Sequence, residues 1–327
     1  LVKTIDVPGE VAIMVRFQDH VTVFRSIIPM GLPVTAPPAK NYIDQHVFAR
    51  LTDLGIPPSK VCDDSTFIRR VTVDIAGRLP TSEEVTVFLA STAGNKRDQL
   101  IDRLLASEDY AVLFANKWIA VLRNQQNAQS GADVTKAFHK FVRDAMAANM
   151  PYDQFVRTIL TASGDTRSVP AANWFAQIAT PVTQAEDVAQ LFLGLRIQCA
   201  HCHHHPFEKW TQNDYYGLTA FFTRTKRTQV KIGKNQNDQR RMTIAFDPGV
   251  AQSLNPRTKQ NVKPTPLEGD PIELANDQDP RTALLAWMTA PENPFFARTL
   301  VNRYWKHFFG RGIVEPEDDM RITNPPS

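Results

Sequence analysis

The sequence predicts a mainly α-helical fold with a short N-terminal β-hairpin and a small β insertion near residues 224–246, and three observations support it. Apolar residues recur at helical spacing from Asn41 to about residue 222. Apolar and polar residues alternate as in β-strands over 10–28 and in part over 224–246. Hydrophobic residues make up 43% of the chain and charged residues 22%, which is typical of a globular protein and excludes a disordered or fibrous one.

Length, charge and cysteine content narrow the function classes. The 327 residues fit roughly two domains of common size. Lys and Arg number 37 and Asp and Glu 34, and a net charge of +3 does not indicate a nucleic-acid or membrane-surface binder. No run approaches the ~18 apolar residues of a membrane span, and three cysteines cannot form a disulfide scaffold. The chain begins with Leu1 and shows no secretory signal segment, so we expect a piece of a longer polypeptide.

The first 40 residues predict a hairpin and a linker. Alternating apolar residues lie on both sides of the turn Gln18-Asp19-His20: Val11, Ile13, Val15 and Phe17 before it, Val21 and Val23 after it. A two-stranded hairpin is marginal in water by itself, so it must pack on something else. The segment PVTAPPA over 33–39 is typical of a stiff linker.

Residues 41–223 are expected to form one all-helical domain. Thr81 and Glu84 have the spacing of a capping box, which begins a helix. Aromatic and aliphatic residues follow at helical spacing in several later stretches, such as Ala111 to Leu122. The simplest interpretation of these stripes is an ordinary hydrophobic core.

A further helix is predicted over residues 183–204. Thr183 and Glu186 have capping-box spacing, and apolar positions follow at steps of four, three, four and three: Val188, Phe192, Leu195, Cys199 and Cys202. We therefore expect both thiols on the apolar face of this helix, turned toward the core. Pro206 should end the helix near His204.

The last hundred residues predict a β-hairpin, a loop and two helices. The hairpin falls within 224–246, around Gly233-Lys234-Asn235, and residues 248–276 are rich in Pro, Asn and Gln, as in an extended loop. Helical spacing returns over Thr282 to Met288 and Phe296 to Phe309.

The stretch Cys199-Ala200-His201-Cys202-His203-His204-His205-Pro206-Phe207 carries the main functional signal. The spacing Cys199-x-x-Cys202-His203 matches the attachment motif of c-type haem. Two thiols three positions apart can both reach the vinyl groups of one porphyrin, and the adjacent imidazole then becomes an axial ligand of the iron. The sequence therefore predicts a helical domain that binds one haem c through Cys199, Cys202 and His203.

Two other interpretations of this stretch stay open. Cys199 and Cys202 could bind zinc together with two of the nearby histidines, which are His201, His203, His204 and His205. Structural zinc usually takes its second pair of ligands from a distant segment, and no second cysteine pair exists here. The stretch could also bind no metal. A thioredoxin-like redox pair is less favoured, because the motif is expected to end a helix instead of following a strand.

The region around the motif resembles a known family. Cys199 to Trp210, followed by Asp214-Tyr215-Tyr216 and Phe221-Phe222, resembles the cytochrome-like domain of unknown function found in large planctomycete proteins, with its C-A-x-C-H-x-H-P-F motif. Two earlier stretches are similar to the same family: Arg69 to Pro80 and Met150 to Val156.

Both ends of the chain carry further resemblances. Residues 279–327 look like the start of the planctomycete-specific domain that usually follows, and residues 10–30 are similar to the last hairpin of a bacterial immunoglobulin-like domain. The resemblance implies a hairpin tail at 1–32, a linker at 33–40, a haem domain at 41–223, a hairpin and loop at 224–276, and a further domain from 277 to 327. It also implies part of a larger envelope, periplasmic or secreted protein, whose family has no settled activity.

Three functions follow from these predictions. The favoured one is electron transfer by a monohaem cytochrome domain, with a redox partner protein and with His203 as the proximal ligand. Candidates for a second axial ligand are His46, His139, His307, Met146 and Met242. An alternative is a peroxidase-like enzyme with an open iron position, which Arg123, His139 and Arg143 could assist. A third is a metal-stabilised structural or binding protein of the envelope.

A basic segment suggests one possible docking region. Residues 224–241 hold seven cationic side chains, which could bind an anionic glycan or an acidic protein: Arg224, Lys226, Arg227, Lys231, Lys234, Arg240 and Arg241. A solvated hairpin face is the simpler interpretation. We do not expect nucleic acid as a partner, because the cationic patch is local and the rest of the chain carries a slight negative charge.

Overall fold

The computed structural model describes residues 3, 7–17, 20–126, 131–204, 208–231, 240–321, 324 and 326. Within this part of the chain there are twelve α-helices and three small antiparallel sheets. The prediction of a mainly α-helical protein is confirmed. No helix among the described residues combines the length and the apolar character needed to cross a membrane.

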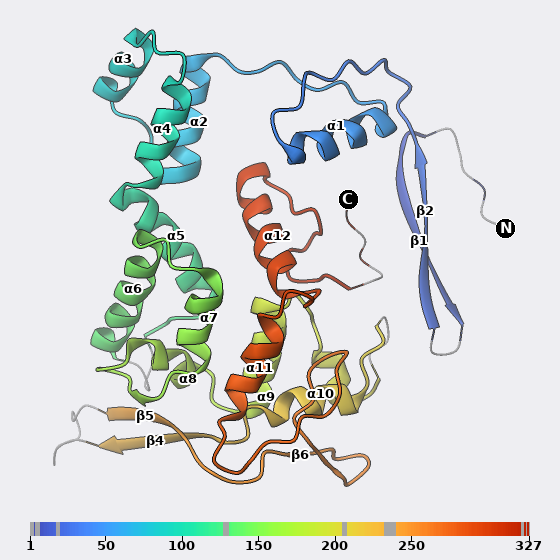
Figure 1. Ribbon diagram of the computed structural model, residues 1–327, viewed down its shortest axis with the longest axis vertical. Coiled ribbons are helices and arrows are strands. Elements are labelled where there is room, and N and C mark those ends of the chain that lie inside the picture. The colour runs from blue at the N-terminus through green and yellow to red at the C-terminus, as the bar shows by residue number, and fades with distance from the viewer. Residues whose placement is uncertain are drawn as a thin grey trace.

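The N-terminal hairpin forms as predicted. Strands β1 (Gly9–Phe17) and β2 (His20–Ile28) pair antiparallel from Gly9 opposite Ile28 to Phe17 opposite His20. Residues 29–40 form no helix or strand, as expected of a linker, and they lead into α1 (Tyr42–Leu54). An ion pair between Arg50 and Glu10 joins α1 to the hairpin. Figure 1 shows both elements on one side of the molecule.

Three helices at the upper left of Figure 1 form a small separate core. They are α2 (Asp64–Ala76), α3 (Ser82–Ala90) and α4 (Lys96–Leu105). Their buried side chains form one cluster: Ile68, Ile75, Ala76, Phe88, Leu100 and Leu104. The capping box of Thr81 and Glu84 begins α3 as predicted, with the Thr81 hydroxyl 3.2 Å from the Glu84 nitrogen.

The main core lies among the middle helices. These are α5 (Glu108–Val121), α6 (Ala132–Ala147), α7 (Tyr152–Leu160), α8 (Asn173–Gln177), α9 (Pro181–Phe192) and α10 (Gln212–Ala220). A short 3₁₀ turn, η1 (Pro170–Ala172), precedes α8. Several large side chains of the main core have no solvent exposure, including Trp174, Phe192 and Tyr215. Burying aromatic side chains supplies much of the stability of such a core.

The predicted second hairpin also forms. Strands β4 (Thr225–Lys231) and β5 (Arg240–Phe246) pair antiparallel, and β5 also pairs with the two-residue strand β3 (Gly164–Asp165). The expected turn at 233–235 lies outside the described residues. Most of 248–276 is loop, with one short pair of strands, β6 (Ser253–Leu254) and β7 (Asn261–Val262).

The last two helices complete the main core. In α11 (Pro280–Met288) and at the start of α12 (Phe296–Phe309), Leu284, Leu285, Met288 and Phe296 join the cluster built from residues 115–244. Figure 1 shows α11 next to α9, with α12 above them, and α12 also contacts α9. Residues on the two sides of the predicted boundary at 277 therefore share one hydrophobic core.

Candidate functional site

Helix α9 leads toward the candidate motif, and its start differs from the prediction. Thr180 caps the helix and Pro181 occupies its first position, where a missing N–H costs nothing. The capping box joins Thr180 to Thr183, with 3.2 Å between each backbone nitrogen and the other residue's hydroxyl. The predicted box of Thr183 and Glu186 is therefore wrong. Glu186 instead accepts a hydrogen bond of 2.7 Å from the Tyr215 hydroxyl.

The predicted continuous helix to His204 is also wrong. Helix α9 ends at Phe192, because Gly194 adopts the left-handed conformation with φ +66° that stops a helix. The Leu195 N–H then donates back to the Ala189 carbonyl at 2.9 Å. A Cβ at Gly194 would lie only 2.8 Å from the Thr299 hydroxyl, so the close contact with α12 also favours glycine.

The motif lies on a separate short turn. A 3₁₀ helix, η2 (Gln198–His201), carries Cys199, and Cys202 and His203 follow it directly. The backbone nitrogens of Cys202 and His203 each lie 3.4 Å from the Cys199 carbonyl oxygen. Cys202 is the residue that caps the 3₁₀ helix at its C-terminal end, three positions after Cys199.

Both motif cysteines are exposed to solvent, which overturns the prediction that they face the core. The apolar stripe stops at Leu195, since the end of α9 breaks the helical spacing before the thiols are reached. Ala200 is the buried residue of the turn, with no exposure. The turn is thus attached to the core through its small apolar residue and presents its two thiols outward.

Helix α10 holds this turn in place through His201. The His201 carbonyl accepts hydrogen bonds from Gln212 Nε2 at 3.1 Å and from the Tyr216 hydroxyl at 3.2 Å. The His201 ring stacks on Tyr215 with 5.0 Å between ring centroids. Burial, together with the hydrogen bond to Glu186, raises the pKa of Tyr215 far above its usual value. Tyr215 therefore stays protonated and continues to donate to Glu186.

The imidazole of His203 is exposed, and one of its nitrogens is already engaged. Its Nδ1 lies 2.6 Å from the His204 carbonyl oxygen, which can only accept a hydrogen bond. Nδ1 is therefore the donor of this hydrogen bond, and in the matching neutral tautomer Nε2 is the nitrogen that can bind a metal. Metal-ligating histidines usually have such a carbonyl partner on their second nitrogen.

A cavity of about 720 Å³ is lined by residues that come before and after the motif in sequence, but not by Cys199, Cys202 or His203. Leu195, before the motif, and Trp210, after it, line one part, while Phe295 and Val301 of the α12 region and Val314 after it line another. Cationic and anionic side chains also border it: Arg25, Glu208, Lys209, Glu268, Arg298 and Arg321. Its size and mostly apolar lining are those of a small-molecule or cofactor pocket.

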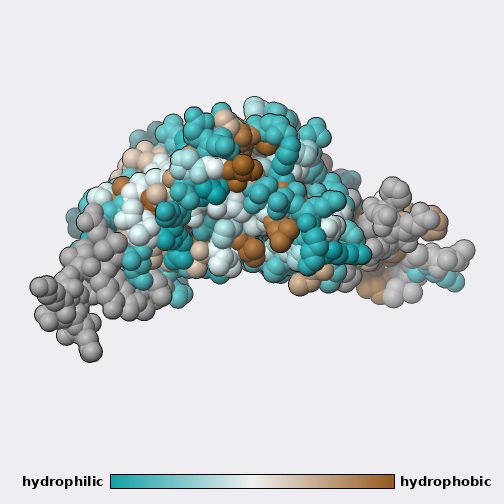
Figure 2. Space-filling model, turned by 90° about the horizontal axis from the view of Figure 1, so that it is seen from below, coloured by the Kyte–Doolittle hydropathy of each residue, from teal (hydrophilic) through white to brown (hydrophobic). Residues whose placement is uncertain are grey.

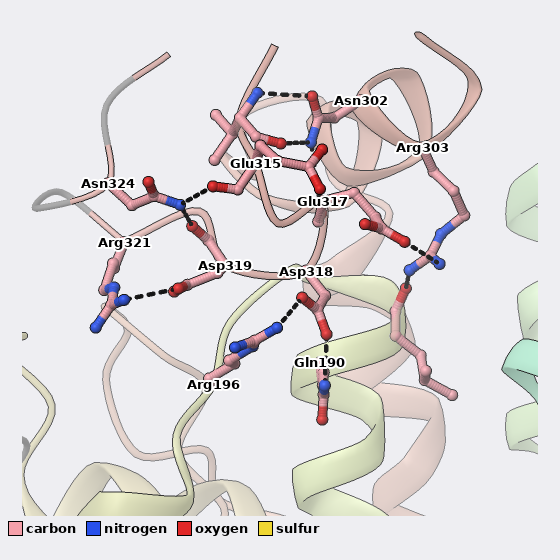
Figure 3. A network of polar contacts seen from close by, with 12 residues as sticks. Gln190, Arg196, Asn302, Arg303, Glu315, Glu317, Asp318, Asp319, Arg321 and Asn324 are labelled. Carbon is pink, nitrogen blue, oxygen red and sulfur yellow. Dashed lines mark hydrogen bonds and ion pairs between the residues drawn. The ribbon is translucent and has the colours of Figure 1, made fainter. Parts of the chain in front are cut away.

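A polar network joins Gln190 and Arg196, which precede the motif, to residues between 302 and 324 (Figure 3). Asp318 accepts hydrogen bonds from Gln190 of α9 and from Arg196, three residues before Cys199, each 2.5 Å long. Burial raises the pKa of the Asp318 carboxyl, but these two hydrogen bonds outweigh burial and lower it. Asp318 is therefore ionised at neutral pH and pairs with Arg196.

The described residues contain no group of three or more His, Cys, Asp or Glu side chains close enough to hold a metal ion. His205, one of the four histidines considered as zinc ligands, lies outside the part of the chain that the structure describes. Zinc binding at the motif therefore stays an untested alternative.

The other predicted haem ligands lie elsewhere. His139 contacts Asn116 at 2.9 Å, and His307 contacts the Asp74 carbonyl at 2.7 Å. Met242 is buried in β5, Met146 borders a different cavity of about 490 Å³, and His46 lies on α1 beside the hairpin. None of these five residues lines the 720 Å³ cavity.

The residues suggested for peroxide chemistry are engaged in other contacts. Arg123 pairs with the buried carboxylate of Asp187 at 2.8 Å, and Arg143 pairs with Asp144 at 3.1 Å. His139 and Arg143 belong to α6, which Figure 1 shows at the left of the molecule, away from α10. The structure does not bring these three residues to the motif.

Part of the basic segment serves the fold. Arg224 donates to the Asp247 and Pro248 carbonyls at 2.7 and 2.6 Å, and Arg227 donates to the Ala176 and Ala179 carbonyls at 2.9 and 3.1 Å. Lys226 is exposed, and the side chains of the other four cations lie outside the described atoms. Figure 2 shows the lower face of the molecule as mainly hydrophilic, with small separate apolar patches. Docking at 224–241 stays a prediction.

Two protein-family models match parts of this chain. A family model described as PSCyt2, a protein of unknown function (DUF1549), matches residues 42–227, which is more than half of the sequence. The chain belongs to the PSCyt2 family. A second model, PSD1, also described as a protein of unknown function (DUF1553), matches residues 280–327. The PSCyt2 region thus includes the motif turn and both helices that hold it.

These matches agree in part with the resemblance drawn from sequence. PSCyt2 and PSD1 are the planctomycete-type domains that it indicated. No match tests the immunoglobulin-like origin of the first hairpin. Neither the curated proteins nor the solved structures include a match to this chain.

Sequence analysis missed three features of the PSCyt2 site. Met320 lines the cavity, Asp318 pairs with Arg196 across 122 positions, and Glu186 accepts from Tyr215. No local pattern indicates such distant partners. Gly194, by contrast, was a readable signal for the end of α9.

Proposed function

We propose that the PSCyt2 region, residues 42–227, is a monohaem cytochrome c domain that transfers electrons. In this proposal a haem is bound covalently by Cys199 and Cys202, and His203 is the proximal iron ligand. The observation that carries the proposal is the motif turn itself. Its two cysteines are both exposed, one within the 3₁₀ helix and one at its C-terminal end, and the next residue is a histidine whose Nδ1 contacts a backbone carbonyl.

The residues present fit this group. Each thiol would add across one vinyl group of the porphyrin, sulfur to one carbon and hydrogen to the other, which requires both sulfurs to be accessible from the same side. His203 would supply Nε2 to the iron while its Nδ1 keeps the proton.

When bound, haem iron carries one electron by alternating between the ferric and ferrous states. The chain's own contribution is to hold that iron rigidly. Three contacts fix the turn that bears His203: two hydrogen bonds to the His201 carbonyl and the stacking of His201 on Tyr215. A rigid ligand frame limits reorganisation during electron transfer, which favours a carrier over a catalyst.

The location and partner follow from the same chemistry. A covalently held haem is retained outside the cell, where a dissociable haem could be lost. We therefore propose that the domain works in the periplasm, in the cell envelope or as part of a secreted protein. Its partner would be a redox protein that approaches the exposed side of the motif turn.

The test is haem retention after denaturation. The chain would be produced in a bacterial periplasm with a haem c maturation system, denatured, and extracted with acid acetone before a reduced-minus-oxidised spectrum is recorded. We expect haem to remain on the wild-type polypeptide and to be absent from Cys199→Ala/Cys202→Ala. Cys62→Ala is the matched control, because the third cysteine precedes α2 outside the motif and should not affect haem retention.

A colourless wild-type chain would overturn the proposal. Metal analysis of that same preparation would then decide between the two remaining interpretations, a zinc site at the motif and a protein without metal. Haem that remains on Cys199→Ala/Cys202→Ala would equally contradict attachment through these thiols.

A further inference from the structure

The cavity of about 490 Å³ has a different lining from the larger one, and no residue of the motif belongs to it. Its walls come from α5, from the end of α6 and the start of α7, and from α12. None of its described lining residues carries a charge, and five are aromatic: Tyr110, Trp118, Tyr152, Phe155 and Tyr304. The volume is in the range of pockets for small molecules, and an uncharged, aromatic lining favours a neutral ligand over an ion.

A tight turn between α6 and α7 shapes one wall of this cavity. Asn149 has φ +46°, a left-handed conformation that asparagine adopts more readily than most residues. Its N–H donates to the Met146 carbonyl at 3.1 Å. The next N–H, of Met150, donates to the Ala145 carbonyl at 2.9 Å. These bonds fix the backbone just before Tyr152, which is the first residue of α7.

The ring of Tyr152 is held by aromatic neighbours. Its centroid lies 4.7 Å from that of Phe296, in a stacked arrangement, and 5.7 Å from that of Trp118. Trp118 also packs edge-on against Phe155 at 5.4 Å. Since both the backbone and the ring are held by other contacts, the position of the Tyr152 hydroxyl does not depend on a hydrogen bond of its own.

The Tyr152 hydroxyl is buried and has no hydrogen-bond partner among the described residues. Burial raises the pKa of Tyr152 above its usual range, so the hydroxyl keeps its proton at neutral pH and can donate it. A buried donor without an acceptor costs free energy of folding. Such groups are rare in native proteins, and one on the wall of a cavity indicates a bound acceptor.

The cavity is also open to solvent. Three of its lining residues are exposed, namely Asn149, Pro151 and Val301, so a molecule can enter between the turn and α12. The nearby guanidinium of Arg303 does not line the cavity, and it lies 5.9 Å from the centre of the Trp118 ring. The described surface that an entering molecule meets is therefore uncharged, with aromatic rings and one hydroxyl donor.

We propose that this cavity binds a small, neutral aromatic molecule that carries a carbonyl oxygen, and that this oxygen accepts a hydrogen bond from Tyr152. The rings of Trp118 and Phe155 would pack against the ring of the ligand. The carbonyl would supply the acceptor that the buried hydroxyl lacks. This site is separate from the motif, and the inference does not depend on haem attachment.

Calorimetric titration of the whole chain with two related probes tests the site. 1-Indanone and indane share the same fused-ring frame, but only 1-indanone has a carbonyl oxygen. Tyr152→Phe keeps the ring and removes the hydroxyl. We expect this variant to bind 1-indanone about fivefold to tenfold more weakly than the wild type, because it loses one hydrogen bond. Its affinity for indane should be unchanged.

A matched variant and a second measurement complete the test. Tyr42→Phe, at an exposed tyrosine of α1, should bind both probes as the wild type does. Urea denaturation without probe should show that Tyr152→Phe is as stable as the wild type or more stable, because a buried hydroxyl without an acceptor stabilises nothing.

Three results would overturn the inference. The first is a wild-type chain that does not bind 1-indanone up to the solubility limit of the probe. The second is equal affinity of the wild type and Tyr152→Phe for 1-indanone. The third is a marked loss of stability in Tyr152→Phe without probe, which would mean that the hydroxyl already bonds to a water molecule. A colourless chain would leave this inference standing, since haem attachment is tested separately.

Discussion

The motif turn and the two helices that hold it differ sharply in burial. In α9 and α10, Phe192 and Tyr215 have no solvent exposure. In the turn between them, Cys199, Cys202 and His203 are all exposed. The chain thus uses its hydrophobic core to fix the position of the turn and leaves the turn's reactive atoms outside. Stability and chemistry are carried by different residues of the same segment.

This division has an energetic consequence. Core side chains stabilise in proportion to the apolar surface they remove from water, whereas exposed side chains contribute little. Substitutions in the helices should therefore destabilise the fold, and substitutions in the turn should change chemistry alone. Four predictions test that contrast, in order of the effect expected on stability.

Phe192→Ala should have the largest effect. Removing a fully buried phenylalanine leaves a cavity, and the loss in free energy of unfolding should be about 3–5 kcal/mol. Urea denaturation followed by circular dichroism measures it. Phe309→Ala is the matched control, since Phe309 is 66% exposed at the end of α12. Similar losses in the two variants would show that the buried side chains of α9 and α10 are not the main source of stability.

Tyr215→Phe should have an intermediate effect on stability. Tyr215 is a buried residue of α10, and its ring also contacts His201 of the motif turn. The variant keeps the ring that stacks on His201 and removes the hydroxyl that donates to Glu186 at 2.7 Å. A hydrogen bond to a charged acceptor contributes about 1.5–3 kcal/mol. Urea denaturation should show a loss in that range, and an unchanged midpoint would contradict it. Tyr42→Phe, at an exposed tyrosine, is the control.

Glu84→Gln tests a region away from the motif and should have a smaller, pH-dependent effect. Arg78 donates to both Glu84 carboxylate oxygens, at 2.8 and 2.9 Å, and these hydrogen bonds lower the pKa of Glu84 from 4.5 to about 2. Because the folded-state pKa is lowered, the stabilisation is present above pH 4.5 and is lost as the pH falls toward 2. Urea midpoints between pH 7 and 2 should fall less steeply in the variant. If the urea midpoints of the wild type and the variant fell equally with pH, the Glu84 carboxylate would not contribute to the loss of stability in acid.

Cys199→Ser/Cys202→Ser should have the smallest effect on stability. Both thiols are exposed, so the free energy of unfolding of the haem-free chain should change by less than about 0.5 kcal/mol. Thermal denaturation of haem-free wild type and variant measures the difference. A loss of several kcal/mol would mean that the thiols belong to the core, as the sequence pattern had suggested, and would remove the contrast drawn here.

Capping residues and hydrophobic spacing predicted a helix or strand well where only one such signal was present. The Thr81–Glu84 box, the first hairpin and the helix from Phe296 to Phe309 all agree with the structure. At α9 two signals competed. Thr183 fits a cap by spacing, but Pro181 is fixed in a geometry that suits the first helical position, which places the cap at Thr180.

The candidate site was predicted only in its local part. Cys199, Cys202 and His203 are adjacent in sequence, so a motif can reveal them. Arg196 and Asp318 meet only because α12 packs on α9, and no periodicity reports that contact. Met320 lies at the cavity for the same reason.

The contact between Gly194 and Met320 couples the two matched segments of this chain. Any side chain at position 194 would collide with Thr299 and Met320, and the glycine's φ of +66° disfavours other residues. The two positions belong to segments assigned to different families, PSCyt2 and PSD1. A substitution at position 194 should therefore displace side chains of the PSD1 segment as well as alter the end of α9 in the PSCyt2 segment.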